Sequence, residues 1–311
     1  MAAKPVIIDC DPGVDDAIAL FLALASPEHL DILAVTAVAG NVPLTLTQAN
    51  ARKICELAGR PDLSVYAGCP RPVLRPLVTA EDVHGRTGLD GIELPEPTML
   101  LQQQHAVNFL IECLLNVRES VTLAMLGPLT NLAIAIIQQP QICQHINEVV
   151  LMGGAVTHGN ITPSAEFNIY VDPHAAHVVF AAGVPLTMIS LDVTNRVIAT
   201  PERLQAIRAL NTPVSAAAIG LLEYYGAFDM KRYGTAGPFL HDPCVIAYLL
   251  QPDLFTYRRA YVNVEITSEL TMGRTVVDLW QRTNYLPNAN VVDSINVEGF
   301  YQLLTQTLAR F

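Results

Sequence analysis

Basic residues are scarce in this sequence. The 311-residue chain has 18 lysines and arginines against 29 aspartates and glutamates, which leaves a formal net charge of −11. No long run of basic residues occurs in it. Because proteins hold phosphate backbones and anionic headgroups mainly with lysine and arginine, we expect neither a nucleic acid nor a membrane as a partner.

The patterns of zinc-binding cysteines and of membrane spans are also missing. The six cysteines are scattered without a CxxC pair, which argues against a zinc knuckle and indicates free thiols in a reducing compartment. No apolar stretch reaches the length of about 18 residues that a membrane span needs. The N-terminus enters a predicted strand without a charged-then-apolar leader. We therefore expect a soluble, cytoplasmic protein.

Two phosphate-binding signatures are absent as well. No GxGxxG follows a predicted strand and no GxxxxGK[ST] occurs, so a cradle for a dinucleotide or a nucleoside triphosphate is not indicated. Apolar residues, in contrast, are abundant. A hydrophobic content of 51% against 15% charged residues allows a substantial core.

Short runs rich in Val, Ile and Leu alternate with helical patterns along the chain. This alternation predicts an α/β fold: a single domain over residues 1–311 with a mostly parallel, Rossmann-like open sheet flanked by helices. Strands are predicted at 6–10, 32–39, 121–126, 149–152 and 185–191. Helices are predicted at 16–24, 44–57, 105–116, 129–138, 173–182, 201–210, 215–225, 242–250 and 297–308. Residues 261–266 and 275–279 are expected to add a small C-terminal hairpin.

Four aspartates gather near the N-terminus: Asp9, Asp11, Asp15 and Asp16. They frame a Pro-Gly turn between a predicted strand and a predicted helix, the place where open α/β sheets bind ligands. Such crowding without lysine or arginine is repulsive unless a cation compensates it, and hard cations such as Ca²⁺ and Mg²⁺ prefer oxygen ligands. The alternative is a solvated turn with an aspartate capping the helix.

Further polar residues follow the next predicted strands or lie in long loops. Asn41 ends the run AVAGN and presents a donor and an acceptor together, or simply caps the next helix. His84 lies in the glycine-rich loop DVHGRTGLDG, where it closes over a ligand or belongs to a surface turn. The carbonyl oxygen of Leu126, in LGPLTN, lacks a helical partner and suits a hard cation, although a helix cap at Thr130 or Asn131 explains the same motif.

Two later motifs complete the polar set. Asn160, Glu166 and Asn168 share one loop, and Glu166 and Asn168 face the same way in an extended chain, which suits the vicinal hydroxyls of a sugar. His241 and Asp242 open an apolar helix, either as a proton donor beside a metal ligand or as an ordinary helix cap. Lysine is nearly absent from these loops, so the site is predicted to hold a cation and a neutral polyol rather than a phosphate.

Taken in order, the motifs resemble those of the nucleoside hydrolase family, of the inosine-uridine-preferring type. They are DCDPGVDDA, AVAGN, DVHGRTGLDG, LGPLTN, MGGA, PSAEFNIYVDP and HDP, and they run from about residue 6 to residue 243. The resemblance implies a ribonucleoside hydrolase of the N-glycosyl hydrolase class. It would release the free base and ribose, with a tightly held Ca²⁺ and an oxocarbenium-like transition state. It also implies a homo-oligomer, commonly a tetramer and sometimes a dimer.

The resemblance further implies a role for each matching residue. The metal ligands would be Asp11, Asp16, Asp242 and the main-chain carbonyl of Leu126. The ribose would be held by Asp15, Asn41, Asn160, Glu166, Asn168 and Asp242, with Met152 packed beneath it. Asp11 matches the general base that activates the metal-bound water, and His241 matches a residue near the leaving base. His84 and Tyr233 match mobile-loop residues that close over the nucleobase.

Some points stay open at the level of sequence. The purine-selective branch of the family holds its base between tryptophans, whereas the only tryptophan here, Trp280, lies far from every motif. Uridine, cytidine and inosine are not ranked, and Tyr225, Phe228 and Tyr233 are each candidates for the aromatic lid. One rival is a phosphohydrolase of the haloacid dehalogenase kind, but the lysine which that chemistry wants is missing. The other rival is a binding module that has lost turnover, although Asp11 and His241 are retained.

Overall fold

A nine-stranded sheet forms the centre of the computed structural model, which describes residues 3–311. Its strand order is β3-β2-β1-β4-β5-β6-β9-β7-β8. The strands from β3 to β9 run parallel, whereas β7 is antiparallel to β9 and to β8. Their bounds are β1 Lys4–Cys10, β2 Leu30–Ala37, β3 Val65–Ala67, β4 Val121–Met125, β5 Ile146–Met152, β6 Leu186–Ile189, β7 Phe255–Val264, β8 Thr275–Asp278 and β9 Ala289–Ile295. The predicted α/β fold with a mostly parallel sheet is confirmed.

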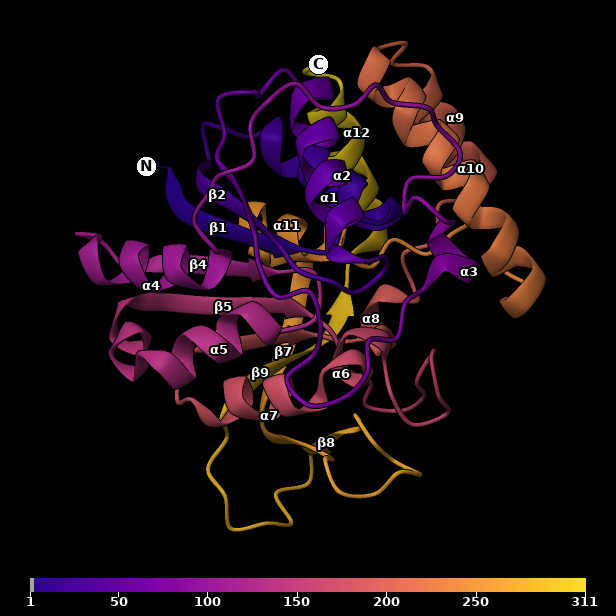
Figure 1. The fold of residues 1–311 in the computed structure, drawn as a ribbon. Coiled ribbons are helices and arrows are strands. Elements are labelled where there is room, and N and C mark those ends of the chain that lie inside the picture. Colours follow the sequence, from indigo (N-terminus) through magenta and orange to yellow (C-terminus); the bar gives the residue numbers. More distant parts are fainter. Residues whose placement is uncertain (1–2) are drawn as a thin grey trace.

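Helices cover both faces of the sheet, and the alternation of side chains along a strand separates two cores. Val6 and Ile8 of β1 point into one core, and Ile7 points into the other. Figure 1 shows α1, α2 and α12 above the sheet and α4, α5 and α7 against its opposite face. The eleven residues of α1 are all buried, because this helix is packed between the sheet and further helices.

The longer helices are α1 Val14–Leu24, α2 Leu44–Leu57, α4 Ala106–Asn116, α5 Thr130–Gln138, α7 Pro173–Ala181, α9 Pro201–Arg208, α10 Pro213–Tyr233, α11 Pro243–Leu250 and α12 Val297–Leu308. Three short ones are α3 Glu81–His84, α6 Phe167–Val171 and α8 Leu191–Thr194, and 3-10 helices cover Pro140–His145 and Pro252–Leu254. In the described range 3–311, no helix combines the length and the apolarity needed to cross a membrane.

The predicted hairpin exists, but the sheet continues beyond it. Strand β7 begins at Phe255, well before the predicted start, and it also pairs with β9. Strands β3 and β9 were not predicted. Strand β3 has only three residues, and β9 carries polar residues at Asn290, Asp293 and Ser294, so neither shows a long apolar run.

Helix α10 corrects a predicted boundary. The sequence predicted a helix over residues 215–225, but the helix continues to Tyr233. The true end carries the usual signals: Lys231 and Arg232 lie in the last turn, and Gly234 closes the helix with φ of 68°. Gly226 stays helical while packing closely on Pro238, where a Cβ would come within 2.9 Å of the Cδ atom.

The strand order explains why the motifs meet. The chain proceeds from β1 outward through β2 to β3, and then returns to the other side of β1 to lay down β4, β5 and β6. The carboxyl ends of β1 and β4 therefore flank the point where the order reverses, the usual ligand crevice of such sheets. Asp11 follows β1 there, and Leu126 follows β4.

Candidate active site and metal centre

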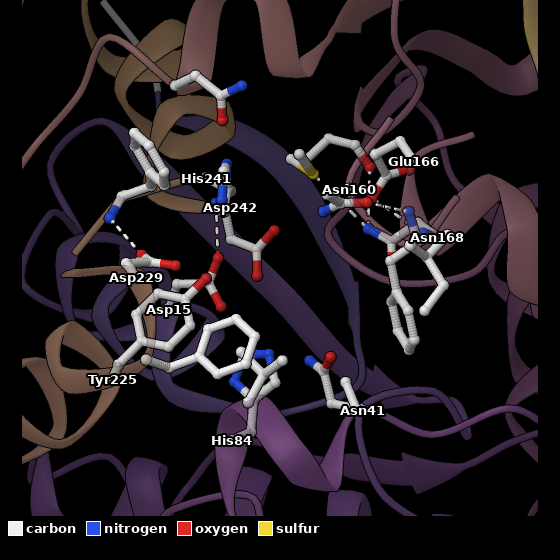
Figure 2. Close-up of a pocket in the computed structure, with 18 of the residues that line it drawn as sticks. Asp15, Asn41, His84, Asn160, Glu166, Asn168, Tyr225, Asp229, His241 and Asp242 are labelled. Atoms are coloured by element: carbon white, nitrogen blue, oxygen red, sulfur yellow. Dashed lines mark hydrogen bonds between the residues drawn. The ribbon is translucent and has the colours of Figure 1, made fainter. Parts of the chain in front are cut away.

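A cavity of about 310 Å³ opens at this carboxyl edge of the sheet. Eleven of the predicted site residues line it: Asp15, Asn41, His84, Leu126, Met152, Asn160, Glu166, Asn168, Tyr233, His241 and Asp242. Figure 2 shows two groups facing each other, with Asp15, Asp242 and His241 on one side and Asn160, Glu166 and Asn168 on the other. Asp11 and Asp16, both fully buried, are not part of the lining.

Three carboxylates converge beside the cavity. Asp15, Asp16 and Asp242 each offer an oxygen such that all three lie within 4.8 Å of one another. Among the ion pairs of residues 3–311, none joins a lysine or arginine to this group. Burial is the larger cause, and the charge of Asp16 the next, that raises the pKa of Asp15 to about 7. Burial and the charges of Asp15 and Asp16 raise the pKa of Asp242 well above its ordinary value. The group is therefore short of a positive charge.

Asp11 lies next to these carboxylates and keeps one oxygen without a partner. Its backbone N–H donates to Asp16 Oδ1 at 3.2 Å, and its Oδ2 accepts the backbone N–H of Asn41 at 2.7 Å. Within the described residues, Oδ1 is buried and accepts no hydrogen bond. A Cβ on Gly40 would lie 2.0 Å from Asp11 Oδ2, and one on Gly127 would lie 2.3 Å from Oδ1, so both glycines allow the carboxylate to fit.

This donor set fits a hard divalent cation. Such ions take oxygen ligands, and an unpaired buried carboxylate oxygen beside three further carboxylates is costly without one. The sequence left open that Asp242 only caps a helix. In the structure its side chain makes no capping hydrogen bond to α11. Asp15, predicted to hold the ribose, is grouped with Asp16 and Asp242, two of the predicted metal ligands.

The opposite wall is organised by Asn168. Its Nδ2 donates to the carbonyl oxygen of Leu126 at 2.7 Å and to that of Met152 at 3.1 Å. The Leu126 carbonyl, predicted to be without a helical partner, is thus bonded to a side chain and keeps one lone pair for a further ligand. The amide therefore links the ends of β4 and β5.

Glu166 holds the start of α6. Its Oε1 accepts the N–H of Asn168 at 2.9 Å, and its Oε2 accepts those of Gly154 at 2.9 Å and Ile169 at 3.2 Å. Burial raises its pKa to about 7 in spite of these bonds. Asn160 Oδ1 accepts the N–H of Phe167 at 2.9 Å, and Asn160 lines the cavity.

Two histidines line the acidic side of the cavity. The backbone N–H of Val14 donates to His84 Nδ1 at 3.1 Å, so the hydrogen of the neutral ring is on Nε2. The His84 ring stacks on Tyr225 with centroids 5.3 Å apart. His241 Nδ1 lies 2.7 Å from the hydroxyl oxygen of Thr194. Burial lowers the pKa of His84 to about 3 and that of His241 to about 4.

The sequence placed His84 and Tyr233 on mobile loops, whereas the structure puts both on helices. His84 ends the one-turn helix α3 and is buried, and Tyr233 ends α10 with 46% of its surface exposed. Tyr225 and Phe228 also line the cavity, so all three aromatic candidates lie at it.

Sequence reasoning missed the buried carboxyl of Asp229. It lines the cavity, accepts the N–H of Phe239 at 2.9 Å, and has a pKa raised by burial to about 6. Asp229 lies four residues after Tyr225 and four before Tyr233, so the three share one face of α10. If the sequence analysis had extended this helix to Tyr233, the spacing would have placed Asp229 on the same face as the two tyrosines.

Comparison with known proteins identifies the family of this chain. A family model described as inosine-uridine preferring nucleoside hydrolase matches residues 6–302. The chain belongs to this family. It is a ribonucleoside hydrolase of the N-glycosyl hydrolase class, as the resemblance implied.

Individual relatives of this nucleoside hydrolase cover almost its whole length. The pyrimidine-specific ribonucleoside hydrolase RihA of Photobacterium profundum is 46% identical over 310 residues, 99% of this chain and 100% of that protein. A solved plant nucleoside hydrolase superposes with a TM-score of 0.91 at 31% identity, covering 98% of this chain and 99% of the other. A purine-preferring ribonucleoside hydrolase from Gardnerella vaginalis gives 0.92 at 31% identity, covering 98% of both.

Proposed function

We propose that this hydrolase cleaves the N-glycosidic bond of pyrimidine ribonucleosides, and of inosine more slowly, with Ca²⁺ as its metal. The observation that carries this proposal is the cavity itself, where buried carboxylates that form no ion pair with a lysine or arginine of residues 3–311 face a wall of amides and a carboxylate. A cation and a sugar diol fit between these two groups better than a phosphate does, since no lysine lines the cavity and Arg232, which does, is exposed at the end of α10 over the rings of Phe228 and Tyr233.

Asp11, Asp16, Asp242 and the carbonyl of Leu126 would hold the calcium, with Asp15 within reach of the same ion. Bound there, the ion would supply Lewis-acid polarisation and orient the oxygens of the sugar. Support for this assignment comes from the unpartnered Oδ1 of Asp11 and from the missing positive charge around Asp15 and Asp242.

Asp11 serves as the general base. Its Oδ1 is a buried acceptor without a partner, next to the carboxylates that border the cavity, and the bond from Asn41 to Oδ2 fixes the orientation of the carboxylate. Deprotonating a water molecule at Oδ1 prepares it to attack the sugar carbon as the bond to the base breaks. Negative charge in the surrounding aspartates stabilises the oxocarbenium-like sugar.

The sugar is held by residues that approach it from both sides of the cavity, with Met152 beneath it: Asp15, Asn41, Asn160, Glu166, Asn168 and Asp242. On the other side of the bond, His241 donates a hydrogen to the departing base. His84 and Tyr233 line the space for that base, with Tyr233 at its exposed rim.

The preference for pyrimidines rests on two observations. The relative RihA is named pyrimidine-specific. Trp280, which the purine-selective branch would need near the base, is 85% exposed and does not line the cavity. The predicted cytoplasmic location and the predicted tetramer or dimer stay predictions, which cell fractionation and light scattering would check.

A panel of ribonucleosides tests the proposal, with chromatography of the released base before and after exhaustive chelation. We expect release from uridine and cytidine above inosine, loss of activity on chelation, and recovery with Ca²⁺. Turnover unchanged by chelation would contradict the metal assignment. Ribose binding without base release would favour a binding module, and phosphate release from a sugar phosphate alone would favour the phosphohydrolase.

A further inference from the structure

Thr194 contacts the histidine that we assign to the leaving base. It is the last residue of α8, it is fully buried, and its Oγ1 lies 2.7 Å from Nδ1 of His241. Nothing in the sequence marked it, because no motif includes it. The following inference rests on the proposed role of His241 as donor to the departing base.

The hydroxyl settles which ring nitrogen carries the hydrogen. Among residues 3–311, the Thr194 hydroxyl has one hydrogen-bond partner, His241 Nδ1. If Nδ1 carried a hydrogen and donated it to Thr194, the threonine's own hydrogen would be buried without an acceptor, at a cost of about 1–3 kcal/mol. If Thr194 donates to Nδ1 instead, both groups are satisfied.

Main-chain hydrogen bonds hold the backbone on both sides of the Thr194–His241 contact. The N–H of Thr194 donates to the carbonyl oxygen of Ser190 at 3.1 Å, and the N–H of Val197 donates to the carbonyl oxygen of Thr194 at 2.9 Å. Two further bonds join this segment to the one that carries His241: Leu240 N–H to Val197 O at 2.9 Å, and Ala199 N–H to Pro238 O at 2.8 Å. The threonine and the histidine are therefore held at a fixed separation by main-chain bonds that do not involve either side chain.

We propose that Thr194 is a positioning residue, whose hydroxyl donates to Nδ1 of His241 and so presents the Nε2–H of that ring to the leaving nucleobase. His241 lines the cavity, and its Nε2 makes no hydrogen bond with any residue of the described chain. Uracil and cytosine both carry acceptor atoms that gain negative charge as the glycosidic bond breaks. A hydrogen on Nε2 can be shared with such an atom, whereas a bare Nε2 lone pair would repel it.

The test replaces the hydroxyl while keeping the shape of the side chain. Thr194→Val removes the donor, and Thr194→Ser keeps it. On uridine and cytidine we expect Thr194→Val to lower kcat about 10- to 100-fold, because a hydrogen-bond donor to the developing negative charge is no longer held in place, with KM little changed. On 4-nitrophenyl riboside, whose leaving group needs no proton, kcat should stay close to wild type. Thr194→Ser should restore turnover of uridine.

A spectroscopic readout separates positioning from a general loss of structure. In the calcium-loaded protein with ¹⁵N-labelled histidine, the His241 resonances are assigned by their absence in His241→Ala. We expect Nε2 to be the protonated nitrogen in the wild type and in Thr194→Ser, and a mixture of tautomers in Thr194→Val. Thermal unfolding shows whether Thr194→Val is folded. If this variant is unfolded, the tautomer is compared between Thr194→Ser and wild type alone.

The outcomes distinguish this inference from the proposed function. A wild-type ring protonated at Nδ1, or equal slowing of uridine and of 4-nitrophenyl riboside in Thr194→Val, would overturn the positioning role. If the wild type released no base from any ribonucleoside, the proposed function would fail, while the tautomer of His241 would still test the role of Thr194.

Discussion

Glu166 allows two opposing physical effects to be weighed against each other. Its carboxylate accepts three backbone N–H groups, which favours the charged form, while complete burial favours the neutral form. Burial dominates and raises the pKa from 4.5 to about 7. The variant Glu166→Gln removes the titrating group and keeps the shape of the side chain, so the difference between the two proteins isolates this group.

The sign of the effect follows from proton linkage. Between pH 4.5 and about 7 the folded protein holds a proton on Glu166 that the unfolded chain has lost, so the free energy of unfolding falls as the pH rises. One pKa unit corresponds to about 1.4 kcal/mol, so the fall across this window is about 3 kcal/mol. Glu166→Gln lacks this contribution. The stability advantage of wild type over variant should therefore shrink by about 3 kcal/mol as the pH rises through the window.

Urea unfolding of both proteins at several pH values between 5 and 8, in chelator, measures this difference. Glu119→Gln, the same substitution at an exposed position, is the matched control. If the advantage of the wild type over Glu166→Gln grew with pH instead, the three N–H donors would outweigh burial, and the reasoning would be refuted.

Three further variants test the floor and the acid side of the site. Asp11→Asn should abolish base release while the far-UV circular dichroism stays native, because the general base is lost; Asp31→Asn, at an exposed position, should keep wild-type activity, and near-normal turnover in Asp11→Asn would remove the assignment. His241→Ala should slow inosine about 10²- to 10⁴-fold in kcat but 4-nitrophenyl riboside far less, and equal slowing in a steady-state assay would exclude a donor role. Gly40→Ala places a methyl 2.0 Å from Asp11 Oδ2 and should lower both turnover and the free energy of unfolding, the latter by about 1–3 kcal/mol in urea; unchanged values would show that the backbone yields there.

Local pattern predicted the elements that carry their own signals. Helix α2 has the predicted bounds, and Asp172 caps α7, with Pro173 as its first residue, by accepting the N–H of Ala175 at 3.0 Å. Strands β1, β4 and β5 were found from their buried apolar runs. Strand β9 was missed because its stability comes from pairing with β6 and β7 rather than from its own residues.

The site shows the same division between local and tertiary information. Oxygen-rich motifs after successive strands identified the residues, since the residue types and the family resemblance are both written in the chain. The tertiary structure decides which carboxylates converge. Asp242 lies at the start of α11, far along the sequence from Asp15 and Asp16, and the fold brings the three together.

By itself, the sequence determined the α/β architecture, the acidic and amide character of the crevice and the family, because periodicity and motif spacing are local properties. Only the tertiary structure decided that Asp229 faces the cavity and that Thr194 meets His241. Such contacts join segments that are distant in the chain, and their partners are set by strand order and helix packing, which no local pattern encodes.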